Sequence, residues 1–150
     1  MKDSADLARP RDLDKAIARI KSREASCVLM REGLIAGEAV GIGVKPILQF
    51  LESGELRGAQ VADKVIGKAA AMLLVLGGVV YVYGEIMSES GRDYLQGRGI
   101  AVSWGKLVEG IINRDGTDIC PLERAVDGVW DPREGYEAIR GAIDVLMGRG

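Results

Sequence analysis

Apolar positions in this chain follow a helical period at the start and a strand-like pattern soon afterwards. Leu13, Ile17 and Ile20 recur at spacings of four and three residues, which predicts one apolar face on a helix. Asp12 precedes this face and belongs to the residue types that cap helix N-termini. We therefore expect an amphipathic helix that begins after Asp12, with residues 1–11 as a loose polar arm ahead of it.

Two short β-prone runs follow this helix, over residues 27–31 and 34–40. Glu32-Gly33 joins them, and glycine supplies the positive φ that a two-residue hairpin turn needs. Pro46 then lies in the first turn of a short apolar helix, where its fixed φ is favourable and its missing N–H is not needed. The sequence thus predicts an antiparallel strand pair followed by a helix.

The middle of the chain is predicted to contain a buried helix and a buried strand. Asp63 is placed to cap a long helix that runs through Leu76 and is apolar on most sides. Residues 79–86 form a near-continuous β-branched and aromatic run, which is typical of a central strand. The uncharged stretch 69–84 is shorter than the roughly 20 residues that a membrane-spanning helix needs, so we expect no membrane segment.

The C-terminal half continues the alternation of helices and strands. Ser88 is predicted to cap a helix, strand 100–104 follows, and Pro121 begins a short helix after an irregular polar segment. Asp131 and the proline after it form the start of a closing helix. A hairpin followed by alternating helices and strands predicts one α/β domain over residues 12–150, a three-layer sandwich with a mixed sheet.

Composition and charge narrow the classes of function. The 150-residue chain has 20 basic and 22 acidic residues and a net charge of −2. No lysine and arginine cluster forms a stripe suited to a phosphate backbone, so nucleic acid is not expected as a partner. The chain has two cysteines and no signal-peptide pattern, which favours reduced thiols and a cytoplasmic location. The sequence leaves the oligomeric state open.

Five segments of the chain carry a resemblance to a known family. They are Ser26-Cys27-Val28-Leu29, Gly43-Val44-Lys45-Pro46, the run from Val61 to Ala70, Ile112-Asn113-Arg114-Asp115-Gly116-Thr117, and Cys120-Pro121-Leu122-Glu123. Together they span most of residues 25–127, and they resemble a bacterial and archaeal family of unknown function. The structurally known representative of that family has a cytidine-deaminase-like fold. The resemblance implies this fold and no reaction, because the family has no established activity.

Deaminases proper bind zinc through three His or Cys ligands at two helix N-termini, with a nearby Glu as acid and base. This chain has no histidine, and Cys27 and Cys120 lie far apart in sequence. We therefore expect neither a zinc site nor another cofactor. By position, the two helix N-termini correspond to Asp63-Lys64 and to residues 88–92, so the resemblance implies a metal-free pocket between them.

Polar side chains around the first of these helix starts are candidate ligand-binding groups. Asp63, Lys64 and Lys68 fall in the first turns of the long predicted helix, where N–H groups and lysines favour a phosphate or carboxylate. Gly67 lies between the lysines, and a mid-helix glycine, about 1 kcal/mol less favourable than alanine, suggests close approach of another group. The alternative is that Asp63 only caps the helix, Gly67 brings it close to the sheet, and the lysines are solvated.

Cys120 is the candidate reactive group because it precedes a proline at a helix start, where the helix dipole favours the thiolate. Asn113, Arg114 and Glu123 flank it in the segment of most distinctive resemblance. Glu85 lies near the carboxyl end of a strand, where α/β sheets tend to bind ligands. The alternatives are a buried helix cap for the cysteine, an ordinary turn for the loop residues, and a solvated carboxylate for Glu85.

These candidates support three hypotheses of different classes. The first is a metal-free pocket that binds a small anionic or nucleotide-like ligand, with Cys120 as its chemical group. The second is a non-enzymatic binding or regulatory module, consistent with the absence of histidine and of a recognisable acid/base pair. The third is a thiol redox sensor at Cys120. Whether the chain is an enzyme stays open at this point.

Overall fold

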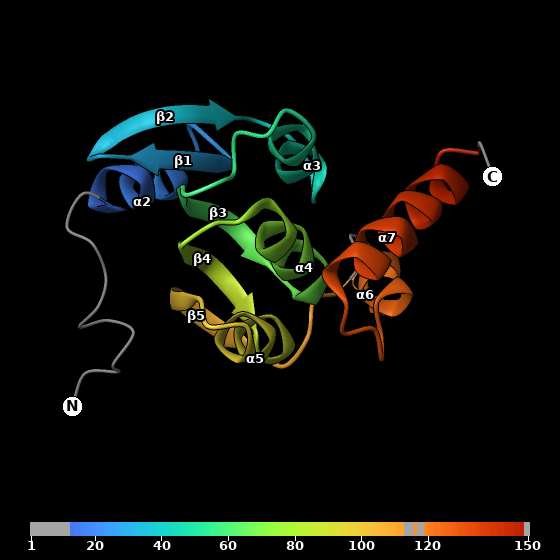
Figure 1. The fold of residues 1–150 in the computed structure, drawn as a ribbon. Coiled ribbons are helices and arrows are strands. Elements are labelled where there is room, and N and C mark those ends of the chain that lie inside the picture. Colours follow the sequence, from blue (N-terminus) through green and yellow to red (C-terminus); the bar gives the residue numbers. More distant parts are fainter. Residues whose placement is uncertain (1–12, 113–115, 117–118, 149–150) are drawn as a thin grey trace.

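The computed structural model describes residues 13–112, 116 and 119–148 and shows an α/β fold around one mixed sheet (Figure 1). The order of strands across the sheet is β2-β1-β3-β4-β5. Strand β1 pairs antiparallel with both β2 and β3, whereas β3, β4 and β5 are parallel to one another. The strands are β1 (Cys27–Arg31), β2 (Leu34–Ala39), β3 (Gln60–Ile66), β4 (Tyr81–Ser88) and β5 (Ala101–Val108).

The predicted hairpin is confirmed at β1 and β2. Glu32 and Gly33 both have positive φ, 50° and 79°, which is the backbone of a type I′ turn. The register of the two strands shifts between Leu29 and Met30, so the outer strand β2 carries a bulge. A bulge increases the local twist of an edge strand and makes it a poorer template for further pairing.

The helices cover both faces of the sheet in three layers, as the sequence predicts (Figure 1). Helix α2 (Leu13–Lys21) packs on one face of the sheet, and its apolar residues form a separate core with residues of β1, β3 and β4. The other face carries the larger core, and the last long helix packs on the outside of α4. The helices are α2 (Leu13–Lys21), α3 (Lys45–Glu52), α4 (Lys68–Gly77), α5 (Glu89–Gly97), α6 (Pro121–Ala125) and α7 (Pro132–Leu146).

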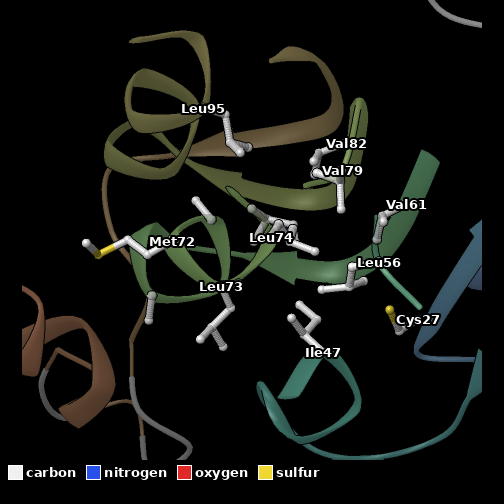
Figure 2. Packing of buried hydrophobic residues seen from close by; sticks show 14 of the residues in the cluster. Cys27, Ile47, Leu56, Val61, Met72, Leu73, Leu74, Val79, Val82 and Leu95 are labelled. Carbon is white, nitrogen blue, oxygen red and sulfur yellow. The ribbon is translucent and has the colours of Figure 1, made fainter. Parts of the chain in front are cut away.

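Helix α4 is the centre of the larger core. Figure 2 shows Leu73 and Leu74 of this helix between Ile47 of α3 and the sheet residues Val61 and Val82. All five side chains are fully buried. Because the helix buries nearly every side from Ala69 to Leu74, its position relative to the sheet is fixed by packing on all sides.

The prediction of a helix from Asp63 to Leu76 is wrong at its start. Residues 60–66 form β3, a central strand paired with β1 on one side and β4 on the other, and the helix begins only at Lys68. Asp63 is therefore a strand residue, and Gly67 is the N-cap of α4 rather than a mid-helix glycine. Two-sided pairing of β3 outweighs the local resemblance of Asp63 to a helix cap.

Strand β5 is longer than the segment 100–104 that the sequence predicts. It runs to Val108 because it pairs with β4 along its whole length, from Ala101 opposite Tyr81 to Val108 opposite Ser88. The irregular segment therefore begins only after Val108. Within the described residues, no helix has the length and apolar character needed to cross a membrane.

Candidate functional site at the N-terminus of helix α4

The N-terminus of α4 lies directly after β3 and has no cap of its own. Its N-cap residue is Gly67, which is extended, with φ −102° and ψ −171°, and carries no side chain to accept a hydrogen bond. The first N–H groups of any helix lack partners within the helix, and leaving them buried and unpaired is costly. Helix α4 therefore needs an acceptor from elsewhere in the chain.

Glu123 of α6 supplies that acceptor. The backbone N–H of Lys68 donates to its Oε1 at 2.9 Å, and the backbone N–H of Ala69 donates to its Oε2 at 2.9 Å. A negative carboxylate is also favoured here by the partial positive charge of the helix N-terminus. The capping residue lies 54 to 55 positions further along the chain.

Gly67 is required for this contact. A Cβ atom at this position would lie 2.6 Å from Glu123 Oε1, so any side chain would push the carboxylate away. The group that approaches Gly67 is thus a side chain of the same protein, and Gly67 is a helix N-cap and not the mid-helix residue that the sequence predicts.

A second contact, again donated by α4, reinforces the first. The Lys68 ammonium donates to the backbone carbonyl of Val126 at 3.0 Å, immediately after α6 ends. We call the contacts of Lys68 and Ala69 with Glu123 and Val126 the α4–α6 clasp. The clasp joins the N-terminus of α4 to both the middle and the end of α6.

The N-terminus of α5 lies beside that of α4. A Cβ atom on Gly91 of α5 would lie 3.0 Å from the carbonyl carbon of Gly67 and from the carbonyl oxygen of Ile66. Helix α5 has the cap predicted from the sequence, because Ser88 Oγ accepts from the N–H of Gly91 at 3.0 Å. Two helix N-termini therefore meet at the carboxyl edge of β3 and β4, and the first already holds a carboxylate.

Asp63 lies deep in β3 beside Cys27, its partner in the register with β1. Its Oδ1 accepts from the N–H of Val65 at 3.1 Å, while its buried Oδ2 has no hydrogen-bond partner among the described residues. Burial, only partly offset by hydrogen bonds, raises the pKa of Asp63 from 3.8 to about 7. Burial and the neighbouring Asp63 in turn raise the pKa of the Cys27 thiol, so Cys27 is a core residue with an unreactive thiol.

Lys64 and Glu85 lie on the opposite side of the sheet from the clasp. Lys64 follows Asp63 in a strand, so it points to the other face, and it is exposed. The carboxylate of Glu85 accepts a hydrogen bond from the hydroxyl of Tyr83, which belongs to the core beneath α2. The structure thus does not bring these two candidates to the N-terminus of α4.

Cys120 is the half-buried N-cap residue of α6, and its side chain makes no capping hydrogen bond. Its carbonyl oxygen accepts from the N–H groups of Glu123 and Arg124, at 3.0 and 3.1 Å. The thiol therefore lies one turn from the clasp. Two further candidates, Asn113 and Arg114, lie outside the described residues.

The part of the chain that the structure describes contains no group of three His, Cys, Asp or Glu side chains placed to hold a metal ion. A shallow cavity of about 240 Å³ lies elsewhere, between α3, α4 and α7, lined by Leu51, Glu52, Leu76, Arg133 and Tyr136. No sequence signal indicated it, because its walls come from three helices that are distant along the chain. The sequence alone predicts neither this cavity nor the role of Glu123 as a remote helix cap.

Fold and site together define an α/β sandwich domain in which a side-chain carboxylate closes the N-terminus of the central helix. The chain belongs to the TM1506 family, a domain of unknown function (DUF1893), whose family model matches residues 15–143. The crystal structure of a DUF1893 family protein, TM1506 from Thermotoga maritima, has the same fold. It is 24% identical, with a TM-score of 0.78 over 91% of each chain. No curated protein matches this chain.

Proposed function

We propose that this domain binds a small anionic ligand at the N-terminus of α4, where Glu123 holds the place of the ligand in the free protein. The observation that carries the proposal is the carboxylate accepting from two adjacent N–H groups, at 2.9 Å each. A helix N-terminus that binds one carboxylate is suited by the same chemistry to another carboxylate or to a phosphate.

The surroundings favour a ligand that carries its charge at one end. Lys68 lies at the helix start, and its ammonium would lose only a neutral backbone carbonyl if it turned to an incoming anion. The neighbouring N-terminus of α5 adds a second positive helix end to the same edge of the sheet. A nucleotide-like molecule with a terminal phosphate fits this description, as does a simple carboxylate.

The same arrangement supports a cytidine-deaminase-like form of the fold in which zinc chemistry is absent. Two helices begin side by side at the carboxyl edge of parallel strands, and the chain has no histidine at all. Asp63, the buried carboxyl nearest in sequence, accepts from Val65 within β3 rather than from the helix start. These features favour a binding or regulatory module over an enzyme.

The test is a titration with inorganic phosphate and with acetate, followed through the backbone amide NMR signals of Lys68 and Ala69. In wild type we expect weak binding, because the anion competes with Glu123. In Glu123→Ala the competitor is gone, so we expect binding roughly tenfold tighter or more, which corresponds to about 1.4 kcal/mol.

Glu134→Ala serves as the matched control, because Glu134 is an exposed first-turn acid of α7. That variant is expected to bind anions as the wild type does. If neither amide signal of Glu123→Ala moves at high phosphate or acetate, the N-terminus of α4 is not an anion site and the proposal is wrong.

A further inference from the structure

We infer that α6 is a latch that Glu123 holds closed against α4, and that release of Glu123 exposes the Cys120 thiol. The latch itself depends only on the contacts of the clasp. Its control by an anion rests on the proposed function, and the experiment below separates the two.

Helix α6 contributes little to the core, packs beside α7, and is hydrogen-bonded to α4 through the clasp. It has five residues, none of which is buried, and Leu122 is only partly covered by the larger core. A one-turn helix has little stability of its own, so its position depends on the groups that tie it down. Among those ties, Glu123 accepts two charge-assisted hydrogen bonds, and the Lys68 ammonium donates a third to Val126 after the helix ends.

The flanking helix α7 is anchored differently and is expected to stay in place. Ile139 is fully buried, and Gly135 packs so closely on Met72 that a Cβ would lie 2.6 Å from the Met72 methyl carbon. Val126, directly after α6, is also fully buried. Loss of the Glu123 contact is therefore expected to release the first turn of α6 from α4, while Val126 and the core around α7 remain packed.

Cys120 reports the position of α6. The carbonyl of Cys120 is bonded to the N–H of Glu123, and the N–H of Cys120 donates to the carbonyl of Ile111 at 3.0 Å. Movement of Glu123 away from α4 pulls on the first turn of α6, where the half-buried thiol lies. Cys27 is fully buried in the core, between strands that are separate from α6, so it is expected to stay protected when α6 moves.

The experiment measures the rate of iodoacetamide alkylation at each cysteine by peptide mass spectrometry, in wild type, Glu123→Gln, Glu123→Ala and the control Glu134→Ala. We expect Cys120 to react roughly five- to tenfold faster in the two Glu123 variants, in line with loss of a helix cap. The control is expected to match the wild type. Equal Cys120 rates in all four proteins would overturn the latch.

The alkylation rate of Cys27 is the internal control for general unfolding. General unfolding of a variant would make Cys27 reactive as well, whereas opening of the latch leaves it protected. Acceleration of both cysteines by the same factor in both Glu123 variants would also overturn the latch, because it would show global loosening instead.

Added phosphate tests control by a ligand. At constant ionic strength, phosphate is expected to accelerate alkylation of Cys120 in wild type and to leave the rate in Glu123→Ala unchanged, since that latch is already open. Faster alkylation in the Glu123 variants, with no effect of phosphate on wild type, would support the latch and contradict phosphate as the ligand in the proposed function.

Discussion

Two consecutive strand–helix units, β3–α4 and β4–α5, meet the same requirement in different ways. Helix α5 is capped by the residue that precedes it, because Ser88 Oγ accepts from Gly91 N–H three positions later. Helix α4 is preceded by Gly67 and receives its acceptor from Glu123, more than fifty residues away. The first cap stabilises one helix, whereas the second also joins α6 to α4.

The strands of the two units, β3 and β4, also differ in the side chains that they bury. Asp63 in β3 pairs in register with Gly84 in β4, so one central strand carries a buried carboxyl group where its neighbour has no side chain. The β3–α4 unit thus holds both the remote cap and the buried carboxyl. Groups that cost stability or depend on distant partners concentrate there, which is common at functional sites.

Asp63→Asn is expected to have the largest effect, and the effect depends on pH. The folded-state pKa of about 7 lies above the ordinary value of 3.8, so between these values the folded protein holds a proton that the unfolded chain has released. The free energy of unfolding of wild type therefore falls as the pH rises from about 4 to 7, by roughly 4 kcal/mol for a shift of this size. Asn has no charge to bury, so the free energy of unfolding of the variant should rise relative to that of wild type over that pH range.

Urea denaturation of both proteins at several pH values between about 4 and 8 measures this difference, because subtraction removes the contributions of other titrating groups. Asp127→Asn, at an exposed position, is the control and should show no such trend. A stability difference between Asp63→Asn and wild type that does not change with pH would show that Asp63 is ionised in the folded protein.

Glu123→Ala is expected to destabilise the protein by about 2 kcal/mol, because it removes two charge-assisted hydrogen bonds from the buried start of α4. Gly67→Ala should lower the free energy of unfolding by a similar amount, since the alanine Cβ would displace the same carboxylate. The double variant should then cost little more than either single one. Denaturant unfolding of all four proteins in this cycle provides the measurement, and additive costs would mean that Gly67 is not needed for the contact.

Ser88→Ala is expected to have the smallest effect of the series, about 1 kcal/mol, because it removes one neutral capping hydrogen bond. Unlike Glu123→Ala, it should leave the alkylation rate of Cys120 unchanged, as the hydrogen bonds of the Ser88 hydroxyl in the described residues go to Ser90 and Gly91 of α5. A faster Cys120 reaction in Ser88→Ala would show that the two helix starts are not independent.

The features predicted from the sequence depend on neighbours along the chain. The hairpin turn at Glu32-Gly33 and the caps at Ser88 and Asp131 each involve residues within three positions of one another, and the structure confirms all of them. The three-layer arrangement also follows from the order of elements, since alternating strands and helices leave few other ways to cover a sheet.

The features that were missed depend on distant partners. Asp63 looks like a helix cap until β1 and β4 pair with its strand on both sides, and its raised pKa arises only from that burial. Glu123 was a candidate through family resemblance alone, and nothing near it in sequence reveals that its carboxylate ends at Lys68. Local chemistry therefore identified residue types of interest without showing which of them meet.

The distance between Gly67 and Glu123 along the chain has a consequence for how the protein is made. All five strands precede Glu123, so a growing chain can complete its sheet while the start of its most buried helix still lacks an acceptor. Closure of that gap waits until α6 has left the ribosome, which makes the final segment a late step in folding. A nascent chain that stops before residue 123 would have all the strands of the sheet, while the first N–H groups of α4 would still lack their acceptor.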